Sequence, residues 1–194
     1  MNDRLPANTV VLGFGNLIRS DDGVGIHAVQ RLQSDPRITA EVLVLDGGTL
    51  GLDLLSYVSD ARRLLVLDAV NIDAAPGTVV RINVQELESL PGGGSVHLLG
   101  LADLLAALRI TAQPIDEVVL LGVQPESTEW GTSLSPSVAA AVDELVRAAT
   151  VQLSDWAVPG YAKSGQGCSY KENFHKENFH ADLCDAFPMD IFGS

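Results

Sequence analysis

The sequence predicts an α/β fold in which a mostly parallel five-stranded sheet is covered by helices on both faces, giving three layers. Two observations lead to this prediction. Short continuous runs of valine and leucine are typical of strands that are buried on both faces. These runs alternate along the chain with segments whose apolar residues recur at helical spacing, as expected when helices connect parallel strands.

The first half of the chain contains three predicted strands, over residues 10–13, 42–45 and 64–67. After the first strand, Ser20 is predicted to cap a helix whose first turn contains Asp21 and Asp22. A hydroxyl N-cap and early acidic residues both stabilise the start of a helix. A shorter helix is predicted over residues 50–58, between the second and third strands.

The second half contains two further strands and two longer helices, with strands over 78–84 and 118–123 and helices over 98–108 and from 136 onward. A glycine-rich segment, 91–94, separates the fourth strand from His97, which directly precedes the first of these helices. Ser135 and Pro136 are favoured at the N-cap and the first helical position, so they predict the start of the last helix.

Composition and charge exclude several classes of function. The 194 residues are 46% hydrophobic, which fits one globular domain with a substantial core. The formal net charge of −13 disfavours binding to nucleic acid or to an anionic membrane. Because residues 1–8 are mostly polar or small, no signal peptide is expected, and no apolar run in the sequence approaches the roughly 20 residues that span a bilayer. Both cysteines lie near the C-terminus, so the main domain suits a reducing compartment and we expect a cytoplasmic location.

A change of composition near residue 155 predicts two parts. Residues 1–154 form the expected domain, and residues 155–194 form an appended tail that is expected to be disordered or to dock on a partner. The tail contains most of the aromatic residues and a tandem Lys-Glu-Asn-Phe-His repeat over 171–180. Its potential metal ligands do not have the spacing of a compact zinc motif; they are Cys168, His175, His180 and Cys184.

The segment after the first strand begins like a dinucleotide-binding loop but has the wrong charge. A Gly13-x-Gly15 turn after an apolar strand would present backbone N–H groups to a phosphate. However, Asp21 and Asp22 follow, and their carboxylates would repel a pyrophosphate and attract a cation. Ile18 stands where the dinucleotide pattern has its third glycine. We therefore interpret this loop as half of a metal-recognising site.

Further candidate side chains are expected at the same edge of the sheet. Asp46 and Asp68 end the second and third strands, and ligands of open parallel sheets bind outside the carboxyl ends of the strands. His97 lies near a helix start, a position expected to favour the neutral imidazole that binds metals. Asp22, Asp68 and His97 together suit a first-row divalent ion such as nickel, zinc or iron. Three protein ligands would leave coordination positions open.

Each of these residues also has a purely structural explanation. Asp22 alone could stabilise a helix N-terminus, Asp46 could cap the following turn, and His97 could be an ordinary loop residue. Asp68 is harder to explain in this way, because a carboxylate at the end of an apolar strand needs a partner. Their expected convergence at one sheet edge favours the functional interpretation.

Six short motifs resemble, in order and spacing, those of the nickel-iron hydrogenase maturation endopeptidases. They are Gly13-Phe14-Gly15-Asn16 with Asp21-Asp22-Gly23, Asp46-Gly47-Gly48-Thr49, Leu67-Asp68-Ala69, a segment from His97 to Leu104, and the segments 122–127 and 134–136. Each glycine-rich motif alone would be weak. The ordered set covers residues 9–150 and is highly specific.

The resemblance implies a twisted five-stranded sheet between helices and an endopeptidase activity. Such an enzyme would remove a C-terminal peptide from a hydrogenase large-subunit precursor after nickel insertion. Asp22, Asp68 and His97 would recognise the nickel and form the catalytic centre. The turn formed by Asp46, Gly47, Gly48 and Thr49 would contact the substrate. The substrate would carry the nickel on its thiolates, no organic cofactor is expected, and the partners would be the precursor and other maturation factors.

Two alternatives from other classes stay open at this stage. A non-catalytic nickel-binding chaperone would use the same metal-recognising residues without cleaving a peptide. A nucleotide-binding protein would use the Gly13-x-Gly15 turn, with Asp46 roughly where a ribose-binding acid would lie. The missing third glycine and the paired acids argue against the nucleotide hypothesis.

Overall fold

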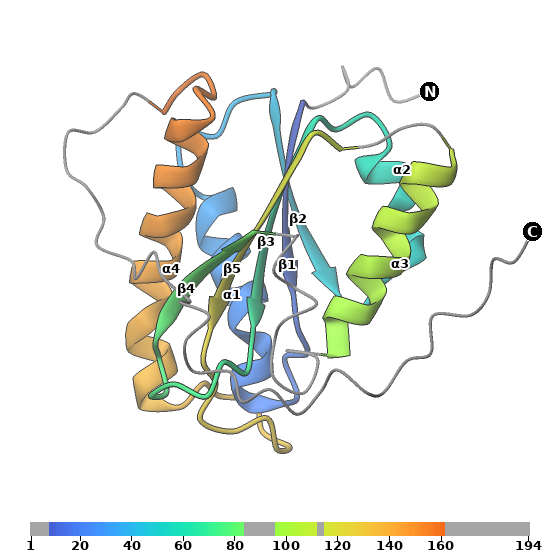
Figure 1. Cartoon of the computed structure of the whole chain (residues 1–194). Helices are drawn as coiled ribbons and strands as arrows, with labels where there is room; N and C mark the ends of the chain where they lie inside the picture. The colour runs from blue at the N-terminus through green and yellow to red at the C-terminus, as the bar shows by residue number, and fades with distance from the viewer. Residues whose placement is uncertain (1–7, 84–95, 112–114, 162–194) are drawn as a thin grey trace, which may run out of the picture.

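A computed structural model describes residues 8–83, 96–111 and 115–161. Its centre is one five-stranded sheet in the order β2-β1-β3-β5-β4 (Figure 1). The strands are β1 (Thr9–Phe14), β2 (Val42–Gly48), β3 (Arg63–Ala69), β4 (Val79–Asn83) and β5 (Glu117–Val123). The first three strands and β5 are parallel, and β4 pairs antiparallel with β5 at one edge. The predicted α/β fold with a mostly parallel five-stranded sheet is therefore confirmed.

The antiparallel direction of β4 follows from the length of the segment before it. Only residues 70–78 separate β3 from β4. A crossover to a parallel strand needs about a dozen residues or more, so this segment is too short for one. The chain therefore turns back at the carboxyl edge of the sheet, and Val79 lies beside Val123 in the register.

Helices cover both faces of the sheet (Figure 1). One face is covered by α1 (Val24–Gln33) and α4 (Pro136–Asp155), and the other by α2 (Leu55–Val58) and α3 (Val96–Ile110). Because side chains alternate along a strand, each strand supplies both cores. Val11 and Leu65 belong to the core beneath α1 and α4, whereas Leu12 and Leu64 belong to the core beneath α3.

Two glycines allow α1 to lie directly against the sheet. A β-carbon at position 13, on β1, would lie 2.4 Å from the carbonyl oxygen of Gly25 on α1. A β-carbon at position 25 would lie 2.2 Å from the carbonyl oxygen of Leu67 and 2.4 Å from that of Phe14. Real β-carbons are not found this close to backbone atoms, so glycine is required at this contact.

The structure differs from the predicted start of the first helix. Ser20 does not cap α1: it opens a short 3-10 helix, η1 (Ser20–Gly23), with a positive φ of 47°, and its N–H donates to Gly131 O. Asp22 lies in this 3-10 turn, and α1 begins only at Val24 without a side-chain cap. The capping prediction was wrong because a contact with a distant loop fixes the backbone at Ser20. By contrast, Ser135 caps α4 as predicted, accepting a hydrogen bond from Val138 N.

The folded core extends beyond residue 154. Trp156, Val158 and Tyr161 are buried in the core beneath α1 and α4. The predicted tail, including its tandem repeat and its cysteines and histidines, otherwise lies outside the described residues. Within the described part of the chain, no helix combines the length and apolar character needed to cross a membrane.

Candidate active site

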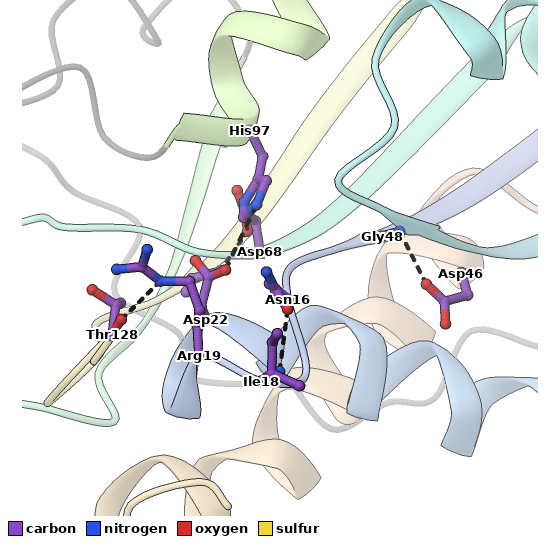
Figure 2. Close-up of polar contacts among 10 residues, drawn as sticks. Asn16, Ile18, Arg19, Asp22, Asp46, Gly48, Asp68, His97 and Thr128 are labelled. Carbon is purple, nitrogen blue, oxygen red and sulfur yellow. Dashed lines mark hydrogen bonds and ion pairs between the residues drawn. The ribbon is translucent and has the colours of Figure 1, made fainter. Parts of the chain in front are cut away.

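Three chain segments meet at the carboxyl edge of the sheet and bring Asp22, Asp68 and His97 together (Figure 2). Asp22 comes from η1, Asp68 from the end of β3 and His97 from the first turn of α3. The Nδ1 atom of His97 lies 3.2 Å from Oδ1 of Asp68, and the Nε2 atom lies 3.7 Å from Oδ2 of Asp22. The imidazole therefore lies between two carboxylates.

Strand and helix periodicity explain why Asp68 meets His97. Asp68 follows Leu64 and Val66 at the two-residue spacing of β3, so it faces the same side as these core residues. His97 precedes the buried Leu101 and Leu104 at helical spacing, so it faces the sheet from α3. Phe14 faces the same side from β1 and stacks on the imidazole, with ring centroids 6.1 Å apart and planes 9° apart.

Burial differs among the three side chains. The side chain of Asp68 is fully buried, and its Oδ1 also accepts a hydrogen bond of 2.8 Å from Ala69 N. The side chain of His97 is 8% exposed and that of Asp22 is 16% exposed. Asp68 therefore holds the ring from the protein interior, while Asp22 is the member of the set most accessible from outside.

Burial and the two carboxylates act in opposite directions on the pKa of His97. Burial alone would lower the pKa of His97, but the hydrogen bond to Asp68 and the charges of Asp68 and Asp22 raise it above its ordinary value. The pKa of His97 is therefore shifted in the direction opposite to the bias toward a neutral imidazole that its place near a helix start suggested. Burial also raises the pKa of Asp22, with the charge of Asp68 acting in the same direction and those of His97 and Arg19 opposing it.

This arrangement suits proton transfer. An imidazole and an accessible carboxylate can exchange a proton at one point on the surface. Within the described residues, no group of three or more His, Cys, Asp or Glu side chains has an arrangement that could hold a metal ion. Within the described residues, the ring nitrogens of His97 pair with carboxylates and not with a hydroxyl or thiol, so this part of the chain offers no support for an activated serine or cysteine.

The glycine turn before Asp22 does not present its amides to a phosphate. The N–H of Gly15 donates to Gly48 O, and that of Ile18 donates to Oδ1 of Asn16 (Figure 2 shows the second bond). The N–H groups of the next four residues also donate to backbone carbonyls within the protein; these are Arg19, Ser20, Asp21 and Asp22. These hydrogen bonds weaken the nucleotide-binding alternative, which needs free amides.

The predicted turn at Asp46 lies apart from the three-residue cluster (Figure 2). Oδ1 of Asp46 accepts a hydrogen bond of 3.0 Å from Gly48 N, and Gly48 has a positive φ of 51°. Asp46 therefore caps its own turn, as its structural explanation expected. Gly47 is buried in this turn and Thr49 is exposed beside it.

Asp21 is the polar residue whose role sequence analysis missed. Its side chain is completely buried and accepts four hydrogen bonds from the segment that leads into α4. The donors are the backbone N–H groups of Glu126, Ser127 and Ser135 and the hydroxyl of Ser135. Asp21 thus fixes η1 to the loop after β5 and to the N-terminus of α4, a position where a negative charge is stabilised.

We expect Asp21→Asn to lower the free energy of unfolding by about 2–4 kcal/mol, because an amide cannot accept all four of these hydrogen bonds. Urea unfolding followed by circular dichroism would measure the loss. Asp22→Asn is the matched control, since the neighbouring Asp22 is partly exposed and should contribute far less to stability. Equal losses in the two variants would contradict the assigned role of Asp21.

The fold and the site together describe an α/β domain with an acidic, imidazole-containing site at the carboxyl edge of its sheet. A family model described as hydrogenase maturation protease matches residues 26–152, a span that includes Asp68 and His97. Among curated proteins, the hydrogenase 2 maturation protease of Escherichia coli is 37% identical over 155 residues, covering 77% of this chain and 94% of the relative.

Other comparisons agree with this match. A hydrogenase expression/formation protein, HupD of Rhodobacter capsulatus, is 34% identical over 156 residues, covering 79% of this chain and 74% of the relative. The structure of the hydrogenase maturating endopeptidase HybD from E. coli superposes with a TM-score of 0.70 at 34% identity, covering 76% of this chain and 93% of that one. The chain belongs to the hydrogenase maturation protease family.

Proposed function

We propose that this protein is an endopeptidase that removes the C-terminal peptide of a nickel-iron hydrogenase large-subunit precursor after nickel has been inserted. The observation that carries the proposal is the Asp22–His97–Asp68 cluster at the open edge of the sheet, in a chain of this family. The related HybD structure is that of a maturating endopeptidase, which supports cleavage as the activity.

Nickel is proposed to be part of the substrate, and the donor set supports this. Carboxylate and imidazole ligands suit a first-row divalent ion. Oδ2 of Asp22 and Nε2 of His97 are 3.7 Å apart, so both can contact one ion with bonds of about 2.0–2.2 Å. Asp68, on the buried side, holds Nδ1 of His97 and completes the recognition set.

The proposed mechanism assigns each residue a task that its environment supports. Asp68 orients the imidazole, as carboxylates behind metal-binding histidines do. His97 holds the ion through Nε2, and Asp22 faces the scissile region, where its other carboxylate oxygen would exchange a proton with the attacking water or the leaving amine. Nickel on the substrate would polarise the scissile carbonyl or the water. Since part of the binding energy depends on the metal, a precursor without nickel would be processed poorly.

Intact-mass measurement of a precursor tests this proposal. We expect a nickel-loaded large-subunit precursor to lose a C-terminal peptide on incubation with the protein, and a nickel-free precursor to stay intact. Cleavage of both samples would support the protease activity and show that the protein does not need nickel to recognise the precursor. Nickel-dependent binding without any loss of mass would instead favour the chaperone alternative.

A further inference from the structure

Large apolar side chains are exposed around the candidate active site. We define the apolar rim as five of them, which follow the carboxyl ends of β1, β2 and β5: Leu17, Ile18, Leu50, Leu52 and Trp130. Leu99, in the first turn of α3, is exposed at the same end of the molecule. Within the described residues, only Tyr57 and Ile110 are comparably exposed elsewhere. A concentration of apolar surface beside a site is typical of an interaction surface.

Hydrogen bonds join the loop that carries Ile18 and Asp22 to the loop that carries Trp130. Gly131 N donates to Ile18 O, and Ser20 N donates to Gly131 O, so the loops after β1 and β5 run side by side. The Arg19 guanidinium lies over the Trp130 ring, 5.6 Å from its centroid. Ile18 and Trp130 are therefore held beside the residue that we place in the active site.

The loop after β2 places the other part of the rim on the same edge. Gly15 N donates to Gly48 O, which ties this loop to the turn that precedes Ile18. A β-carbon at Gly51, between Leu50 and Leu52, would lie 3.5 Å from Cα of Gly100, in the first turns of α3. This loop therefore lies against the start of the helix that carries His97.

The charge around the rim indicates the chemistry of a partner. The segments that carry it, 15–23, 48–54 and 124–135, contain five acidic residues and one arginine. Asp21 is buried, which leaves Asp22, Asp53, Glu126 and Glu129, and the exposed Asp46 lies directly before the second segment at the end of β2. Arg19 is already engaged by the Trp130 ring and by Thr128 O at 3.0 Å. An apolar surface among acidic groups fits a partner segment with apolar and basic side chains.

We propose that the apolar rim is the docking surface for an apolar, basic polypeptide segment of the precursor next to its cleavage point. The proposal rests on the proposed function and names the chemistry of its substrate. The rim supplies binding energy outside the reacting centre, so it holds the precursor while Asp22 and His97 act on the scissile bond.

Matched pairs of substitutions test the docking surface. Ile18→Ser should lower kcat/KM for the nickel-loaded precursor about tenfold through KM, with kcat nearly unchanged. Ile110→Ser is the control, because Ile110 is 85% exposed at the far end of α3 and should leave the parent rate intact. In a second pair, Trp130→Ser should lower kcat/KM in the same way, and Tyr57→Ser is its control and should process at the parent rate. Added salt should also lower kcat/KM of the parent, since the partner segment is basic.

The outcomes separate this proposal from the proposed function. Normal cleavage by Ile18→Ser and Trp130→Ser would overturn the docking surface and leave the protease standing. If the parent protein sediments as a dimer and Ile18→Ser dissociates that dimer, the apolar rim is an interface between copies of this chain, and the docking proposal is wrong. If the parent binds the precursor without cleaving it, the proposed protease fails, and the same variants test docking through the Kd for the precursor.

Discussion

Replacing His97 with alanine is expected to reduce precursor processing at least about 100-fold, because the imidazole lies between the two carboxylates of the cluster and pairs with both. The cleaved fraction of nickel-loaded precursor, followed by mass spectrometry over time, would measure this loss. His27→Ala is the matched control, since His27 lies on α1 outside the cluster and should process at the parent rate.

The same prediction extends to Asp22→Asn, which keeps the shape of the side chain and removes its charge. Asp22 is partly exposed, so this variant should fold normally while it loses processing. Far-ultraviolet circular dichroism and thermal unfolding would establish that both variants are folded. Processing at the parent rate by a folded His97→Ala or Asp22→Asn protein would show that the assignment of that residue is wrong.

Gly25→Ala is expected to have the largest effect on stability, lowering the free energy of unfolding by about 3 kcal/mol or more. The added methyl group would meet the carbonyl oxygens of Leu67 and Phe14, which belong to hydrogen-bonded strands and cannot move like flexible side chains. Relief would require α1 to move away from the sheet and to lose contact with the core. Urea unfolding would give the change directly.

Gly100→Ala provides the control for this substitution. Position 100 also lies in a helix, but among the described residues its β-carbon would have its nearest contact at 3.4 Å, from Cα of Gly51. Alanine is favoured over glycine in a helix by up to about 1 kcal/mol, so this variant should be as stable as the parent or more stable. A loss at Gly25 no greater than that at Gly100 would contradict the close approach of α1.

Much of the fold follows from local patterns in the sequence. The valine and leucine runs mark the four parallel strands, because strands buried on both faces need apolar residues at every position. The meeting of Asp68, His97 and Phe14 also follows from these patterns: two-residue spacing puts Asp68 and Phe14 on one face of the sheet, and helical spacing turns His97 toward that face. Asp68 and His97 were expected at one edge of the sheet because ligands bind at strand ends, whereas the stacking of Phe14 on His97 was not predicted.

Other features depend on contacts between distant parts of the chain and could not be predicted. Ser20 adopts its positive φ where its N–H donates a hydrogen bond to Gly131 O. The sequence around Ser20 gives no indication of this contact with a distant loop. The pair Asp21-Asp22 looked like two equivalent acids, yet one is a buried hydrogen-bond acceptor and the other faces the site. The raised pKa of His97 likewise depends on carboxylates supplied by η1 and β3.

The Asp22–His97–Asp68 cluster is assembled from segments next to the helical layers on both faces of the sheet. Asp22 precedes α1, which packs on one face of the sheet, and His97 belongs to α3, which packs on the other. The two side chains meet only after both helical layers have docked on β3. A newly synthesised or partly unfolded chain thus lacks the assembled cluster, so the proposed peptide-bond cleavage is expected only once both helical layers are in place.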